Sequence, residues 1–143
     1  MGVVVPLSGQ EAGQASIEPL LELTSKDMAR VNEVILSHAS SYVDMIPELA
    51  NHLINSGGKR LRPMVTVAAS RMCAPCEGND HVLLAAAVEF MHTATLLHDD
   101  VVDDSNMRRG FFSINALWKN KVAVLVGDYL LSRGLLVALE HKD

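Results

Sequence analysis

Apolar residues at helical spacing, in segments separated by glycine and proline, restrict this chain to a helical fold. The clearest segment lies between Ser16 and Ala39 and has its apolar residues at Leu20, Leu23, Met28, Val31, Val34 and Ile35. This spacing is typical of the buried face of an amphipathic helix. No segment shows the strict alternation expected of a strand, since the run VAVLV is short and has helical surroundings. The pattern therefore predicts an all-α fold.

Glycine, proline and capping residues divide the chain into consecutive helices. The predicted helices span 16–39, 43–58, 63–73 and about 80–102, and one or two more lie within 113–141. Pro63 opens the third helix, Gly57-Gly58 ends the second, and Asn79 or Asp80 caps the fourth. Gly134 leaves open whether the last segment is one helix or two. Residues 1–15 are expected to form a flexible tail.

Composition limits the classes of function that the chain can have. Its 143 residues predict one domain, and a hydrophobic fraction of 49% is enough for a core. The net charge of -5 disfavours binding to nucleic acid or to an anionic membrane. We expect no transmembrane segment, because no apolar run approaches the ~20 residues that span a bilayer. Without a signal peptide, the expected location is the cytoplasm.

The only cysteines, Cys73 and Cys76, form a CxxC pair. A zinc site would need a second pair of ligands, and a thioredoxin-like redox site would need a βαβ unit. Neither is present in the sequence, so the pattern favours two ordinary thiols near the end of a helix.

The stretch LLHDDVVDDSNMRRG carries four aspartates within six positions at the end of an apolar helix. Helical geometry places His92, Asp99 and Asp103 on one face, with Asp100 and Asp104 on a neighbouring stripe. Clustered carboxylates suit Mg²⁺, which uses one or two of them together with substrate phosphates. The alternative is a solvated acidic helix end paired with the following arginines, but acidic residues at a helix C-terminus oppose its dipole.

The stretch GGKRLRP concentrates Lys59, Arg60 and Arg62 between two predicted helices. Pro63 should hold Arg62 extended, just before a helix N-terminus that favours anions. The alternative is a basic loop paired with surface acids. A carboxylate–metal candidate together with basic clusters fits a diphosphate, and the apolar interior fits a hydrocarbon tail on that diphosphate.

Three motifs in order, GGKRLRP, VEFMHTATLLHDDVVDDSNMRRG and GDYLLSRG, closely resemble the trans-isoprenyl diphosphate synthases, or polyprenyl synthetases. The resemblance runs from about Ile17 to the end and is greatest to long-chain, octaprenyl-type members. It implies an antiparallel helix bundle of the isoprenoid synthase type around a deep cavity, usually homodimeric. The implied reaction condenses isopentenyl diphosphate with an allylic prenyl diphosphate, through ionisation, attack of the double bond and loss of a proton.

The resemblance also implies roles for individual residues. Asp99, Asp100 and Asp103 match the aspartate-rich motif that holds Mg²⁺ on the allylic diphosphate, and Arg108 matches an arginine that contacts it. The isopentenyl diphosphate site is matched by Lys59, Arg62, His92 and Arg109. By its position alone, His92 could instead be a hydrogen-bonded core histidine.

Product length is expected to depend on Ala94 and Thr95, which precede Asp99 by about one turn. In family members with short products, bulky aromatic residues near these positions close the cavity floor. Both residues are small here, which predicts a product longer than C20.

Length is the largest departure from the family. Family members are about twice as long and have a second aspartate-rich motif, so residues 16–143 are expected to be the N-terminal half of an isoprenoid synthase domain. The chain alone is then expected to be incomplete for turnover, and the alternative is a non-catalytic fragment or a partner subunit of a heteromeric prenyl synthase. A di-iron bundle is disfavoured, because the ExxH from Glu89 to His92 has no second copy.

Overall fold

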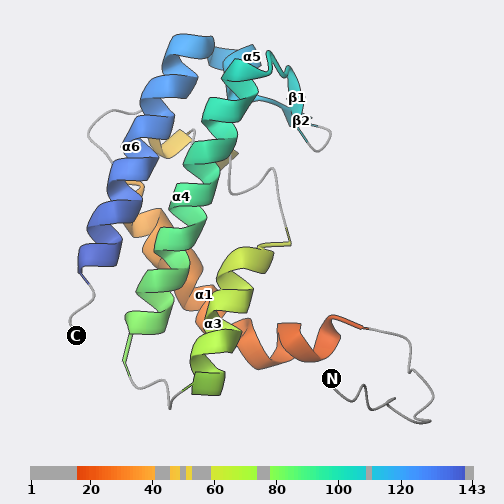
Figure 1. The fold of residues 1–143 in the computed structure, drawn as a ribbon, viewed down its shortest axis with the longest axis vertical. Coiled ribbons are helices and arrows are strands. Elements are labelled where there is room, and N and C mark those ends of the chain that lie inside the picture. The colour runs from red at the N-terminus through yellow and green to blue at the C-terminus, as the bar shows by residue number, and fades with distance from the viewer. Residues whose placement is uncertain are drawn as a thin grey trace, which may run out of the picture.

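The computed structural model describes residues 16–40, 46–48, 51–52, 59–73, 78–108 and 111–140. These residues form an all-α fold with one very short hairpin, which confirms the predicted class (Figure 1). The helices are α1 (Glu18–His38), α3 (Leu61–Cys73), α4 (Asp80–Val102), α5 (Ile114–Trp118) and α6 (Asn120–Leu139). The hairpin pairs β1 (Met107–Arg108) with β2 (Phe111–Phe112), with Met107 opposite Phe112.

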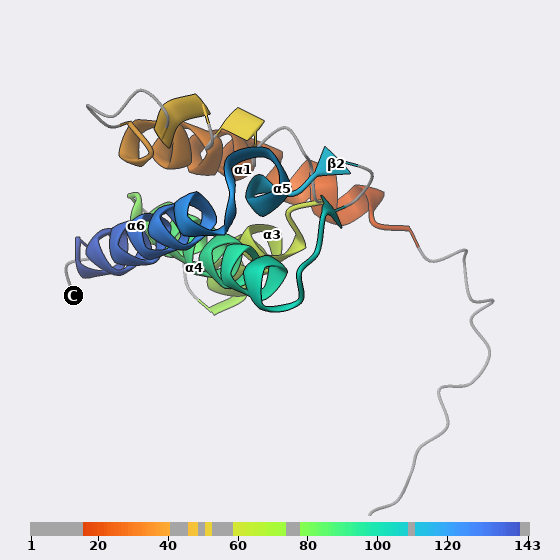
Figure 2. The same cartoon turned by 90° about the horizontal axis from the view of Figure 1, so that it is seen from above.

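Helix α4 is the centre of the fold. Figures 1 and 2 show α6 lying beside it and running in the opposite direction, while α1 and α3 pack on another side of α4. The alanine run Ala85, Ala86 and Ala87 of α4 is fully buried. The surrounding core is mainly aliphatic and includes Val31, Val67, Val82, Phe90, Leu97, Ile114, Val126, Leu130 and Val137.

Two glycines of α6, Gly127 and Gly134, form what we call the glycine seam against α4. A Cβ atom at Gly134 would lie 3.1 Å from the Phe90 Cβ atom and 3.2 Å from the Ala87 carbonyl oxygen. A Cβ atom at Gly127 would overlap the ring of His98. The two positions are seven residues apart and therefore share a helix face. Gly134 does not interrupt α6, which is continuous from Asn120 to Leu139. Both glycines instead allow α6 to lie close to α4.

Helix α3 begins two residues earlier than predicted. This helix begins at Leu61, so the expected extended conformation of Arg62 is wrong. Pro63 occupies the third position of the first turn, where a backbone N–H has no partner within the helix. The turn is entered through Arg60, which has a φ of 44°. The predicted helix 43–58 lies largely outside the described residues, although 46–48 and 51–52 are helical; the predicted tail 1–15 is also outside them.

The C-terminus of α4 is closed by a Schellman motif. The Asp104 N–H donates to the Val101 carbonyl (3.4 Å), and the Ser105 N–H donates to the Asp100 carbonyl (2.9 Å). Asp104 takes the left-handed position with a φ of 51°, which glycine fills in most such motifs. Asp104 therefore ends the helix and does not continue the acidic stripe on which the sequence pattern had placed it.

Replacing Asp104 with glycine is expected to stabilise the protein by about 0.5 kcal/mol. Glycine removes the cost of the left-handed conformation, about 1 kcal/mol or more, but loses more backbone entropy on folding. Denaturant unfolding of Asp104→Gly beside Asp104→Ala measures the effect. Alanine should be clearly less stable than glycine, and equal stability of the two variants would contradict the assigned conformation.

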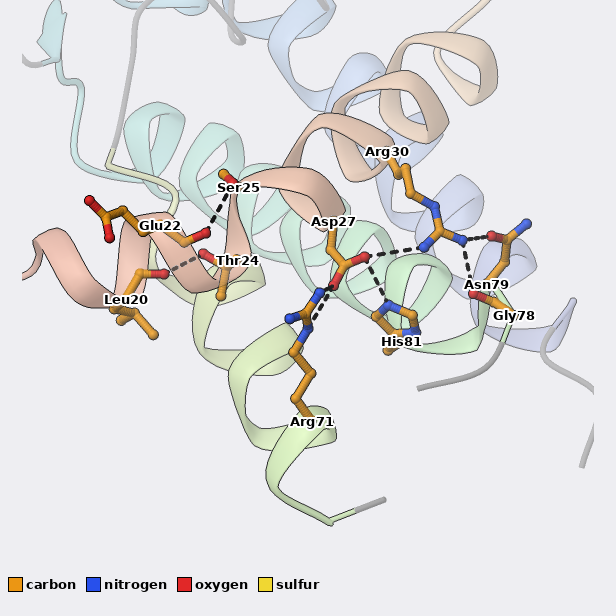
Figure 3. A network of polar contacts seen from close by, with 10 residues as sticks. All are labelled: Leu20, Glu22, Thr24, Ser25, Asp27, Arg30, Arg71, Gly78, Asn79 and His81. Carbon is orange, nitrogen blue, oxygen red and sulfur yellow. Dashed lines mark hydrogen bonds and ion pairs between the residues drawn. The ribbon is translucent and has the colours of Figure 1, made fainter. Parts of the chain in front are cut away.

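A buried polar network centred on Asp27 joins α1 to α3 and α4 (Figure 3). The Asp27 side chain is 6% exposed and accepts two hydrogen bonds from Arg71, from Nε at 2.9 Å and Nη2 at 2.7 Å. Arg30 Nη1 donates to its other oxygen at 3.1 Å, and His81 Nε2 lies 3.3 Å from that oxygen without hydrogen-bond geometry. Burial raises the pKa of Asp27, but Arg71 and His81 outweigh it and hold the pKa below its ordinary value of 3.8.

Helix α6 corrects one expectation about membranes. Its residues Asn120–Leu139 are long and apolar enough to cross a bilayer by length and composition, with a mean hydropathy of 1.8. A core helix of a soluble protein passes the same test, and one-third of this segment is buried against the rest of the fold. The statement that no run approaches a spanning length is therefore wrong for α6, and the test by itself assigns no membrane role.

Candidate functional site

Two exposed carboxylates lie at the C-terminal end of α4, that of Asp99 in its last turn and that of Asp103 at its C-cap. Both residues are exposed, and the Asp103 N–H donates to the Asp99 carbonyl at 2.8 Å, which places them one helical turn apart. Neither forms an ion pair with a side chain that the structure describes. Asp100, between them in sequence, is only 4% exposed and has interactions of its own. The arrangement presents two carboxylates to a ligand and keeps the third inside.

The donor set fits a metal that is completed by its substrate. Among the described residues, no three His, Cys, Asp or Glu side chains are grouped closely enough to hold a metal ion. Mg²⁺ needs no such cage, because it is commonly bound by one or two carboxylates plus substrate phosphates and water. Asp99 and Asp103 offer two such carboxylates, and the roles of Asp99, Asp100 and Asp103 as metal ligands stay predictions.

The residue before this pair, His98, is held against α6. Its Nε2 atom lies 3.3 Å from an Asp128 carboxylate oxygen and 3.4 Å from the Val124 carbonyl oxygen. The ring occupies the space that Gly127 leaves open. The contact fixes the last turns of α4 beside α6, directly before Asp99. Sequence analysis missed this set, although the dipeptide Gly127-Asp128 lies in the motif GDYLLSRG.

The basic stretch before α3 divides into two kinds of side chain. Arg60 Nη1 donates to the Asn32 side-chain oxygen at 2.8 Å, so Arg60 ties this stretch to α1. Lys59 and Arg62 are exposed, and Arg62 lies in the first turn of α3. These two remain available to an anion. Arg108 has a described backbone position in β1, and Arg109 lies outside the described residues.

The remaining candidates lie along the middle of α4. His92 is half-buried and has interactions of its own. Thr95 is exposed, and its hydroxyl donates to the His92 carbonyl at 2.7 Å. Ala94 is 1% exposed within the core. The structure therefore brings Thr95 to the surface of α4 and separates it from Ala94, which sequence analysis had paired with it.

Of the two cysteines in the CxxC pair, the structure describes Cys73. Cys73, the last residue of α3, is exposed and free. Cys76 lies outside the described residues. The role of the CxxC pair as ordinary thiols thus stays a prediction.

The family model, the similar sequences and the similar structures all point to one protein family. The model of the family described as polyprenyl synthetase matches residues 43–143. An octaprenyl diphosphate synthase of Escherichia coli (strain K12) is 51% identical over 118 residues, which cover 82% of this chain and 36% of that protein. This chain therefore spans little more than a third of the length of that relative.

Solved structures show the same similarity. A crystal structure of a decaprenyl diphosphate synthase from Rhodobacter capsulatus has a TM-score of 0.83 at 51% identity, covering 87% of this chain and 38% of that one. A polyprenyl synthase from Caulobacter crescentus CB15, complexed with calcium and isoprenyl diphosphate, has a TM-score of 0.84 at 48% identity. That match covers 90% of this chain and 39% of the other.

Proposed function

Because the chain belongs to the polyprenyl synthetase family, we propose that it binds the allylic substrate of a long-chain prenyltransferase. The proposed reaction joins isopentenyl diphosphate to an allylic prenyl diphosphate and lengthens the chain by one isoprene unit. The observation that carries this proposal is the exposed pair Asp99 and Asp103 on the end of α4, free of ion pairs with described side chains.

The roles follow from charge and position. Asp99 and Asp103, with Asp100 as a third candidate, would hold Mg²⁺, which when bound supplies positive charge beside the departing diphosphate. Arg108 would contact the same diphosphate. Lys59, Arg62, His92 and Arg109 would bind isopentenyl diphosphate, with Lys59 and Arg62 as cations that its phosphates can reach from solvent.

The proposed chemistry balances without a redox partner. The bond between C1 of the allylic substrate and its diphosphate oxygen breaks, and the diphosphate leaves with both electrons. The double bond of isopentenyl diphosphate supplies the electrons of the new carbon–carbon bond. Loss of one proton then restores a double bond, so positioning and electrostatic stabilisation are the protein's main contributions.

Calorimetric titration tests the proposal on this chain. A non-hydrolysable allylic thiodiphosphate is titrated into the folded protein with and without Mg²⁺. We expect binding only when Mg²⁺ is present. Absence of binding to a chain with normal helical circular dichroism would reject the proposed site in this protein.

Thr95→Phe is expected to discriminate between ligands by tail length. An exposed aromatic side chain one turn from Asp99 would obstruct a long tail and leave the diphosphate contacts intact. Affinity for a C20 thiodiphosphate should fall about tenfold, equivalent to losing about 1.4 kcal/mol of apolar contact, while that for the C5 analogue stays within twofold. Thr95→Val, which keeps the size of threonine, is the control. If Thr95→Phe weakens binding of the C20 and C5 analogues equally or not at all, Thr95 does not lie beside the hydrocarbon tail.

We further propose a homodimer located in the cytoplasm. A row of exposed apolar side chains on α6 supports association: Val124, Leu125, Leu131, Leu135, Leu136 and Leu139. The same row supports the second candidate function, a subunit that completes its site with a different chain, because monomeric proteins seldom leave large apolar patches uncovered. Light scattering of the pure chain distinguishes the two, since only self-association gives a dimer without a partner.

A further inference from the structure

The chain that follows α4 folds back and is fixed at two points to the helix that carries the carboxylates. The first point is the Schellman motif, where the Ser105 N–H donates to the Asp100 carbonyl at 2.9 Å. Asp100 lies between Asp99 and Asp103, so the backbone of Ser105 is anchored to the same turn as the open carboxylate pair.

The second point is Ser113, which uses each of its polar groups. Its hydroxyl donates to the Ser105 carbonyl at 2.6 Å, and its N–H donates to the Asn106 carbonyl at 3.0 Å. Its own carbonyl accepts from the N–H groups of Ala116 and Leu117 at 3.1 and 3.2 Å, which begins α5. Ser113 is 4% exposed, and the next residue, Ile114, is 2% exposed in the core. Ser113 thus joins the end of α4, the hairpin and α5 at one buried position.

The segment closed by these contacts carries a basic residue. Between Ser105 and Ser113 the backbone forms the β1–β2 ladder, with Arg108 paired to Phe111. At the base of this loop, the Ser113 hydroxyl forms a side-chain hydrogen bond to the Ser105 carbonyl, and the described part of the ladder is paired through backbone groups. The Ser113–Ser105 hydrogen bond therefore ties the strand that carries the backbone of Arg108 to the chain directly after α4.

We propose that Ser113 is a positioning residue for the allylic diphosphate, an inference that rests on the proposed function. The carboxylate pair is held by the helix itself and does not need Ser113. The hydroxyl instead sets the distance between the carboxylate pair and the basic loop, so that one diphosphate meets both. Its loss should weaken diphosphate binding and leave α4 folded.

The test compares Ser113→Thr, which keeps the hydroxyl, with Ser113→Val, which has the shape of threonine without it, and with Ser113→Ala. Each variant is titrated with dimethylallyl thiodiphosphate in Mg²⁺. Loss of one buried hydrogen bond predicts an affinity about tenfold weaker for Ala and Val. Threonine should stay within about twofold of the parent chain, a difference of some 0.4 kcal/mol. Ala and Val variants that bind like the parent, or a Thr variant as weak as Val, would overturn the proposal.

Two further measurements keep the result decisive. Insertion of one glycine after Asn106 lengthens the loop without changing Ser113 or α4, and it should weaken binding as Ala does; this variant decides the matter if Ser113→Ala fails to fold. Amide hydrogen exchange at Ser113 and Phe112 should accelerate in Ala and Val and recover in Thr. If the parent chain binds no diphosphate, the proposed function fails while exchange still tests the positioning contact, and unchanged exchange would reject it.

Discussion

The double substitution of Asp99 and Asp103 by asparagine is expected to weaken Mg²⁺-dependent binding of an allylic diphosphate strongly. Asparagine keeps the size of each side chain and removes both negative charges that would hold the cation. A loss of about tenfold for each carboxylate gives about 100-fold weaker binding, equivalent to about 2.8 kcal/mol. Calorimetry with the thiodiphosphate analogue in Mg²⁺ measures it.

Stability provides the internal control for this experiment. Negative charges near a helix C-terminus oppose its dipole, so their removal should stabilise the protein by about 0.3–1 kcal/mol. The variant should then be more stable than the parent chain and yet bind the analogue far more weakly. Glu22→Gln/Glu33→Gln, which makes the same charge change at exposed positions on α1, should bind like the parent chain. Retention of Mg²⁺-dependent binding by the aspartate variant would remove the main support for the metal site.

Asp27→Asn is expected to lower the free energy of unfolding by about 2 kcal/mol at neutral pH. Breaking a fully buried ion pair costs about 3–5 kcal/mol, and the value here is smaller because solvent reaches the partners. The Arg71 and Arg30 side chains are 35% and 39% exposed, whereas Asp27 is 6% exposed. Urea unfolding at pH 7 checks the value, with Glu22→Gln as a surface control within about 0.5 kcal/mol of the parent.

The same pair of proteins should show a defined pH dependence. The pKa of Asp27 is lower in the folded chain than its ordinary value of 3.8, so the folded state favours the ionised form. Its contribution is therefore fully present above about pH 5 and is lost as the pH falls through 3.8 toward the lower, folded pKa. The stability difference between parent and Asp27→Asn should shrink over that range. A difference that stays constant down to pH 3 would contradict the network as described.

The helices were predictable because their signals are local. The predicted segments for α1 and α4 agree with the observed Glu18–His38 and Asp80–Val102 to within two residues. Apolar spacing defines such helices, and Asn79 marks the start of α4. Asn79 nevertheless makes no side-chain cap, because its side chain accepts a hydrogen bond from Arg30 of α1. The pairing of Asn79 with Arg30 depends on the packing of α1 against the start of α4, which the spacing of apolar residues within one helix does not predict.

The buried network was missed because periodicity was judged on apolar residues alone. The buried stripe of α1 runs through Thr24, Asp27, Val31 and Ile35, so two of its members are polar. Asp27 lies at the correct spacing, but its partner Arg71 is 44 residues away and belongs to a different helix. Only the packing of α1 on α3 brings the two together.

The candidate site was partly predictable for the same reasons. The i,i+4 spacing of Asp99 and Asp103 predicts a common face in any helix, and the structure shows that both residues are exposed. The burial of Asp100 and the left-handed backbone of Asp104 depend on how α4 ends. Ser113 carries no local signal, because its contact with Ser105 forms only after the hairpin closes.

The glycine seam has a consequence for how a ligand would be received. With no side chain at Gly127 or Gly134, α4 and α6 touch through backbone and ring atoms that have little freedom to rearrange. The two helices should therefore move as one rigid body. The carboxylate pair at the end of α4 is then held in its binding geometry before any ligand arrives. A ligand that docks there need not supply the entropy of ordering the helix, so more of its contact energy is expressed as affinity.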